Sequence, residues 1–108
     1  MKKRKLTLRK IKTSHKSDKK YDAVFSTPDG NEKIIPFGQR GYNDFIIYNK
    51  QTGENNANKR KQLYIQRHSG MGEHWSKPDT PGALSRWLLW NKKTLKASLK
   101  DFKRKFKV

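Results

Sequence analysis

The segment Thr94-Leu-Lys-Ala-Ser-Leu-Lys-Asp-Phe-Lys-Arg-Lys-Phe-Lys107 carries an apolar stripe and a cationic stripe at helical spacing. Its apolar side chains recur at steps of four, three and four residues, on one helix face: Leu95, Leu99, Phe102 and Phe106. One residue further on in each case, and so about 100° around the helix, stand Lys96, Lys100, Lys103 and Lys107. The segment predicts an amphipathic helix with an apolar face for the core and a basic flank outside it.

The residues immediately before this helix predict a second, shorter one. Asp79 or Thr80 can cap its N-terminus, and Pro81 suits its first turn because its missing N–H would have no helical partner there. The run that follows, Ala83-Leu-Ser-Arg-Trp-Leu-Leu-Trp90, is apolar over most of its circumference. Four of its side chains are candidate core residues: Leu84, Trp87, Leu88 and Trp90.

The N-terminal third has the alternation and turn residues of antiparallel strands. A short strand is expected over residues 5–12, and the next strand places three side chains on one face: Tyr21, Ala23 and Phe25. Thr27-Pro-Asp-Gly30 is a strong turn signal, and Lys33-Ile-Ile-Pro-Phe37 follows it as the partner strand. Because Pro36 has no N–H, the outer edge of that strand is expected to be unpaired.

The middle of the chain is less regular. The apolar run over residues 45–48 fits a strand or a helix, and both remain open at this length. Residues 49–58 offer little to bury, so a loop is expected there. Residues 59–68 combine helix formers with spaced apolar positions, which indicates a short helix that Gly70 and Gly72 end.

These elements predict an α+β fold, in which a small N-terminal antiparallel β-meander packs against two to three C-terminal helices. Residues 1–19 are expected to form a basic flexible arm that can include the short strand over 5–12. Residues 20–108 are expected to form a single small domain that ends in the basic amphipathic helix. Three Trp, four Tyr and five Phe supply the core, because each large ring buries about 150–250 Å².

The charge of the chain indicates a polyanionic partner. Its 108 residues carry 27 Lys and Arg against 9 Asp and Glu, a formal net charge of +18. This divides into +9 for residues 1–20, +1 for residues 21–80 and +8 for residues 81–108. Since a net charge of about 2–8 keeps a small domain soluble, the two basic ends favour binding to a polyanion, most commonly nucleic acid.

Several classes of protein are excluded or not expected. The chain has no cysteine, which excludes disulfide frameworks, thiol nucleophiles and zinc fingers. No apolar run approaches the roughly 18 residues of a membrane span, so neither a transmembrane helix nor a secretory signal is expected.

The basic residues of the two ends are the candidate nucleic-acid contacts, because lysine and arginine neutralise phosphates. The N-terminal candidates are Lys2, Lys3, Arg4, Lys5, Arg9, Lys10 and Lys12. The C-terminal candidates are Lys92, Lys93, Lys96, Lys100, Lys103, Arg104 and Lys107. Secondary candidates lie on the expected 59–68 helix: Lys59, Arg60, Lys61 and Arg67. Phosphate contacts position a nucleic acid without reading its bases, so no strong sequence preference is expected.

Catalysis and metal binding have little support in the sequence. His68, Glu73 and His74 have the residue types of a general base or a metal site, but two glycines between them break helical spacing. The acidic residues are scattered singly, whereas metal-dependent phosphodiester cleavage needs converging carboxylates. We expect no enzyme, metal, cofactor or small-molecule substrate. His68 is expected to pack or to contact phosphate, and the core is expected to hold Trp75, Trp87 and Trp90.

Four parts of the sequence, taken together, resemble a known protein family. They are Phe37-Gly-Gln-Arg-Gly-Tyr-Asn-Asp44, Tyr64-Ile-Gln-Arg-His68, Trp75 with Pro78, and Thr80-Pro-Gly-Ala-Leu-Ser-Arg-Trp-Leu-Leu-Trp-Asn-Lys92. From about Tyr21 to Phe106 the chain resembles a family of small basic proteins of unknown function encoded by large DNA viruses of algae and protists. The resemblance implies no catalytic residue or ligand. It implies a setting in a cytoplasmic viral factory, the host nucleus or the virion, where DNA is condensed and capsid layers are joined.

Arg86 lies inside the last of these stretches, on the short helix. We expect its guanidinium to pair with Asp79 or Asp44, or to reach a phosphate.

The sequence thus favours a non-enzymatic protein that binds nucleic acid, DNA more than RNA, and packages or organises a viral genome in the virion. The alternative is a minor capsid protein whose basic ends bind acidic capsid surfaces or the inner membrane. A nuclease is a third hypothesis. A basic amphipathic helix can also lie on an anionic membrane, but the thin core needs its apolar stripe, so membrane contact is not expected.

Overall fold

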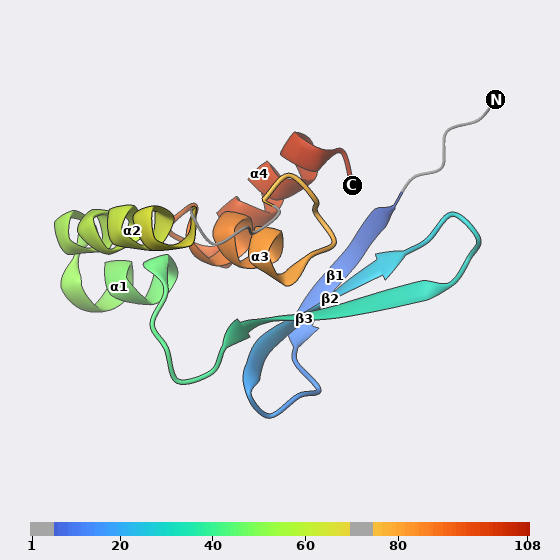
Figure 1. The fold of residues 1–108 in the computed structure, drawn as a ribbon, viewed down its shortest axis with the longest axis horizontal. Coiled ribbons are helices and arrows are strands. Elements are labelled where there is room, and N and C mark those ends of the chain that lie inside the picture. Colours follow the sequence, from blue (N-terminus) through green and yellow to red (C-terminus); the bar gives the residue numbers. More distant parts are fainter. Residues whose placement is uncertain (1–5, 70–74) are drawn as a thin grey trace.

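A computed structural model describes residues 6–69 and 75–108 of the chain. Three antiparallel strands come first, in the spatial order β1-β2-β3: β1 (Thr7–Thr13), β2 (Lys19–Ser26) and β3 (Glu32–Gln39). The helices follow: α1 (Phe45–Thr52), α2 (Glu54–His68), α3 (Pro81–Leu84), the π-helical turn η1 (Ser85–Leu89) and α4 (Leu95–Phe106). Helices α3 and α4 lie against the sheet, and the α1–α2 pair lies beside them (Figure 1). The predicted α+β fold, with a β-meander followed by helices, is confirmed.

The β2–β3 hairpin forms at the predicted turn. The Thr27 carbonyl accepts a hydrogen bond from the Gly30 N–H (3.0 Å), and the Thr27 N–H donates to the Asn31 carbonyl (2.8 Å). Gly30 has a φ of 90°, which favours glycine. β3 is an edge strand, as Pro36 predicted.

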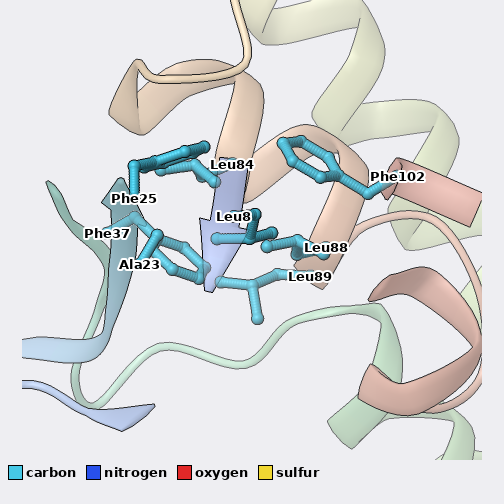
Figure 2. Close-up of a cluster of buried hydrophobic side chains, with 8 residues drawn as sticks. All are labelled: Leu8, Ala23, Phe25, Phe37, Leu84, Leu88, Leu89 and Phe102. Carbon is cyan, nitrogen blue, oxygen red and sulfur yellow. The ribbon is translucent and has the colours of Figure 1, made fainter. Parts of the chain in front are cut away.

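The core lies between one face of the sheet and the C-terminal helices (Figure 2). The strands contribute Leu8, Ala23, Phe25 and Phe37, and the helices contribute Leu84, Leu88, Leu89 and Phe102. The prediction that Leu84 and Leu88 are core residues is confirmed. Trp87 and Trp90 are half-buried and pack against the margin of this cluster. The remaining apolar side chains of the α4 stripe also pack against it: Leu95, Leu99 and Phe106.

Side-chain caps fix where the two C-terminal helices begin. The Thr80 hydroxyl accepts from the Ala83 N–H (3.3 Å), with Pro81 in the first turn as expected. In the same way, the Thr94 hydroxyl accepts from the Ala97 N–H (3.1 Å). Each cap satisfies a backbone donor that the first helical turn leaves without a partner.

Gly38 allows η1 to pack directly on β3. Its φ is 76°, and a Cβ placed there would lie 2.8 Å from Cδ1 of Leu89. Both the backbone conformation and the close approach therefore require glycine at this position.

The loop predicted over residues 49–58 is wrong. Helices α1 and α2 run through this segment and are interrupted at Gly53, whose φ is 89°. The run over residues 45–48, which fitted a strand or a helix, forms the first turn of α1. Ala57, the one apolar residue of the segment, is fully buried. The helices are held by packing on each other, which the polar composition of the segment does not reveal.

Asp22 of β2 fastens the end of the β1–β2 hairpin. Its fully buried carboxylate accepts hydrogen bonds from the Ser14 hydroxyl (2.6 Å) and the His15 backbone N–H (3.0 Å), and contacts His15 Nδ1 at 2.5 Å. Burial disfavours the charged carboxylate, but the bonds from His15 and Ser14 outweigh it and lower the pKa of Asp22 to about 2.

Asp22→Asn is expected to lower the free energy of unfolding by about 1–3 kcal/mol at neutral pH, because it disrupts a buried network of charge-assisted hydrogen bonds. The stabilisation by the wild-type carboxylate is complete above 3.8, the pKa of an unperturbed Asp, and is lost as the pH falls toward 2. Urea unfolding followed by tryptophan fluorescence measures both effects. A gap between the two proteins that does not narrow between about pH 4 and pH 2 would contradict this account.

Candidate functional site

Helix α4 is oriented by its apolar stripe and by one of its flanks. Phe102 points into the core and is fully buried. On the flank that faces η1, Ser98 is fully buried and its hydroxyl accepts from the Lys92 N–H (2.9 Å). Lys105 Nζ lies 4.3 Å from the Trp87 ring centroid on the same flank. The opposite flank of α4 therefore points away from η1.

This opposite flank carries the predicted lysine stripe, and all four side chains are exposed: Lys96, Lys100, Lys103 and Lys107. Within residues 6–69 and 75–108, none of the four forms an ion pair. The acidic residue of the helix, Asp101, bonds instead to Asn91 (2.8 Å) and Arg104 (2.5 Å). The Asn91 bond, aided by Arg104, lowers the pKa of Asp101. The lysine flank therefore presents uncompensated positive charge.

Strand β1 packs against the same buried cluster as helix α4. Along β1, Lys10 and Lys12 alternate with Ile11, which packs against the core cluster, so these two lysines project from the other face of the sheet. Leu8 of β1 shares the buried cluster with Phe102 of α4, and Figure 1 shows the end of α4 close to the beginning of β1. Strand β1 and helix α4 are thus neighbours in the fold.

The exposed basic residues of β1 are Arg9, Lys10 and Lys12. We call these three, together with Lys96, Lys100, Lys103 and Lys107, the β1–α4 surface. The predicted contacts Lys2, Lys3, Arg4 and Lys5 lie outside the described residues.

Other basic candidates make contacts within the fold. Lys61 is half-buried, and its Nζ donates to the Asn91 carbonyl (2.9 Å). Burial, with the nearby charges of Arg86 and Lys92, lowers the pKa of Lys61. Lys93 pairs with Glu54 (3.1 Å) between exposed side chains, which contributes little to stability. Lys59 and Lys92 are exposed.

Arg86 does not pair with Asp79 or Asp44 as expected. Its guanidinium carbon lies 4.2 Å from the Trp87 ring centroid and 5.5 Å from that of Trp75, and its Nη1 donates to the Trp90 carbonyl (2.8 Å). Burial lowers the pKa of Arg86, and Tyr64 opposes the shift. Arg86 therefore contacts three tryptophans within the fold.

The two carboxylates expected near Arg86 bond to lysines instead. Asp44 accepts from Lys20 Nζ (2.7 Å) and also caps α1, where it accepts from the Ile47 N–H (3.0 Å). Asp79 accepts from Lys33 Nζ (2.7 Å). Asp44 thus links the start of α1 to β2, and Asp79 links the segment before α3 to β3.

Aromatic rings join the α1–α2 pair to the rest of the fold. Tyr64 of α2 stacks on Trp90 with ring centroids 4.5 Å apart and an interplanar angle of 10°. It also stacks on His68 at 4.3 Å and lies parallel to Trp75 at 6.4 Å. Tyr48 of α1 lies 6.2 Å from Trp90. Trp75 and Trp90 were expected in the core, but both are half-buried. Their rings contact the α1–α2 pair instead.

A cleft of about 530 Å³ opens between the end of β3, the α1–α2 pair and the α3–η1 segment. Its cationic lining is Lys19, Lys20, Arg60 and Arg67. Among the described lining residues, Asp44 is the only carboxylate, and it is bonded to Lys20. Its aromatic and apolar lining includes Tyr42, Tyr48, Leu63, Tyr64 and Trp90. The cleft thus combines excess positive charge with aromatic surface, which suits a planar anionic ligand.

No pattern along the sequence marks Tyr42 or Leu63 as functional, and the cleft was not predicted. Its walls come from four separate stretches of the chain, residues 19–20, 37–48, 60–68 and 81–90, and it exists because the α1–α2 pair lies beside the α3–η1 segment. The glycines near Tyr42 are the one sequence feature that could have indicated a functional loop here. Gly41 has a φ of 92° in the bend that carries the Tyr42 side chain.

The histidine cluster considered for catalysis is only partly described. His68 stacks on Tyr64, whereas Glu73 and His74 lie outside the described residues. Within the described ranges, no group of three His, Cys, Asp or Glu side chains could hold a metal ion. Nor does any helix in those ranges have the length and apolarity needed to cross a bilayer.

Residues 9–68, from β1 to the end of α2, match the family of unknown function DUF5754. The chain belongs to DUF5754. The part that matches DUF5754 includes the basic residues of β1 and all four cations of the cleft, and it ends before α3 and α4. No curated protein and no solved structure matches this DUF5754 chain.

Proposed function

We propose that this DUF5754 protein binds nucleic acid, DNA more than RNA, through phosphate contacts from the β1–α4 surface, with no sequence preference and no catalysis. The observation that carries the proposal is the lysine flank of α4, which is exposed and lacks ion pairs within the described residues, on a helix that shares the core cluster with basic β1. From Lys96 to Lys107 it extends about 16 Å at about 1.5 Å per residue. Phosphates of one DNA strand recur about every 3.4 Å along the duplex axis, so the flank can contact several of them.

We propose packaging or organising a viral DNA genome as the biological role. The net charge of +18 on 108 residues supports this role, because such charge opposes folding of the free protein and is neutralised by a polyanion. The resemblance to small basic proteins of large DNA viruses supports a location in the virion or in the infected host cell.

A salt series of DNA binding tests the proposal. If six to ten phosphates are contacted, the affinity for a duplex should fall by roughly 10³–10⁵ between 50 and 200 mM salt. Two duplexes of unrelated sequence should bind equally at each salt concentration, within about threefold. Fluorescence anisotropy with the full chain measures both. No detectable binding at 50 mM salt would overturn the proposal and favour a role on acidic capsid surfaces.

A further inference from the structure

We propose that the cleft binds one unpaired nucleotide of a single-stranded nucleic acid, with the base against Tyr42 and Leu63 and the phosphate against Arg60 and Arg67. This inference rests on the proposed function and specifies the form of nucleic acid preferred. The β1–α4 surface would contact phosphates of any strand, whereas the cleft would select strands with exposed bases.

The rim of the cleft carries exposed apolar side chains. Large apolar side chains that are exposed in the described residues are Ile34 (41%), Leu63 (54%) and Tyr42 (68%), and the last two line the cleft. The backbone of a duplex offers phosphate and sugar, and its base faces are stacked inside. An unpaired base has an open ring face that aromatic and apolar side chains can cover.

The lining of the cleft also carries excess positive charge. Asp44 is bonded to Lys20 and to the Ile47 N–H, so it does not neutralise the other cations of the lining. These are Lys19, Arg60 and Arg67. Arginine binds phosphate through paired N–H donors, and excess positive charge beside an apolar rim matches a nucleotide better than an uncharged ligand.

The walls of the cleft are held in place before any ligand binds. On one wall, Tyr64 stacks on Trp90 at 4.5 Å, and the Arg60 guanidinium lies 5.3 Å from the Tyr48 ring centroid. On the rim, the Tyr42 N–H donates to the Gln39 carbonyl (3.3 Å). The volume of about 530 Å³ lies within the roughly 300–1,000 Å³ of small-ligand sites. Preorganised walls reduce the entropy lost on binding.

The test compares three fluorescent DNA probes at 50 mM salt: a blunt duplex, one of its strands alone, and the duplex with a short single-stranded overhang. The wild-type chain is expected to bind the strand and the overhang probe more tightly than the blunt duplex. Tyr42→Ala should weaken binding of these two probes by about 5- to 150-fold, the effect of losing one stacked base. It should leave blunt-duplex binding unchanged.

Two variants are matched controls. Tyr42→Phe keeps the ring and should retain wild-type binding to all three probes. Ile34→Ala removes an exposed apolar side chain of β3 that is not part of the cleft lining and should also have no effect. Arg67→Ala is expected to repeat the selective loss seen with Tyr42→Ala.

The outcomes separate this inference from the proposed function. If all probes bind with equal affinity and Tyr42→Ala changes none of them, the cleft proposal is overturned and phosphate binding by the β1–α4 surface stands. If no probe binds, both proposals fail. If Tyr42→Ala weakens binding of a labelled polyglutamate but not of the single strand, the cleft is a site for acidic peptides and the nucleotide assignment is overturned.

Discussion

Phe102→Ala is expected to lower the free energy of unfolding by about 3–5 kcal/mol, the usual cost of removing a large aromatic side chain from a core. Phe102 is fully buried and belongs to the cluster that joins α4 to the sheet and to η1. Its ring also contacts Phe106, with centroids 4.8 Å apart, so the substitution loosens the rest of the apolar stripe. Since small domains are stable by about 5–15 kcal/mol, this loss is a large fraction of the total.

Chemical unfolding followed by circular dichroism measures this loss. Tyr42→Ala is the matched control, because it removes an aromatic ring of similar size that is 68% exposed, and it should change stability by less than about 0.5 kcal/mol. Equal midpoints for Phe102→Ala and wild type would show that α4 is not part of the cooperative core.

The parts of the fold that the sequence predicted are those where one local pattern is enough. The α4 stripe has helical spacing from Leu95 to Phe106, and the hairpin turn has Pro28 and Gly30 where a turn requires them. In both cases the residues that determine the structure lie within a few positions of one another, so the periodicity or turn chemistry can be recognised directly.

The α1–α2 pair could not be predicted in the same way. In its polar segment Ala57 is fully buried, and Tyr64 stacks on Trp90 from a distant part of the chain. Long-range contacts of this kind override local composition. The cleft depends on them, so its lining residues carried no pattern along the sequence.

The roles of individual basic residues also depended on tertiary contacts. Lys61 and Arg86 have the same residue types as the exposed candidates, yet one bonds to the Asn91 carbonyl and the other lies over Trp87. The buried Ser98 was the informative residue, because its flank of α4 carries no lysine stripe, packs toward η1 and leaves the lysine flank outside. Charge composition alone does not separate the two groups.

The triple variant Lys96→Gln, Lys100→Gln, Lys103→Gln is expected to reduce the salt dependence of duplex binding strongly. These side chains are exposed and without ion pairs in the described part of the chain, and glutamine retains good helix propensity, so α4 should remain folded. Each phosphate contact contributes about 0.9 to the slope of log affinity against log salt, so three lost contacts lower the slope by about 2.7.

Raising the salt from 50 to 200 mM should therefore weaken binding of this variant much less than binding of wild type. The fold-loss of affinity should be about 40 times smaller for the variant. The matched control removes the same net charge from exposed lysines outside the β1–α4 surface: Lys16→Gln, Lys50→Gln, Lys77→Gln. If binding depended on net charge alone, the two triple variants would have equal slopes. A slope close to wild type for the control and a reduced slope for the α4 variant would localise the phosphate contacts to the lysine flank, because only contacted cations release counterions from the nucleic acid.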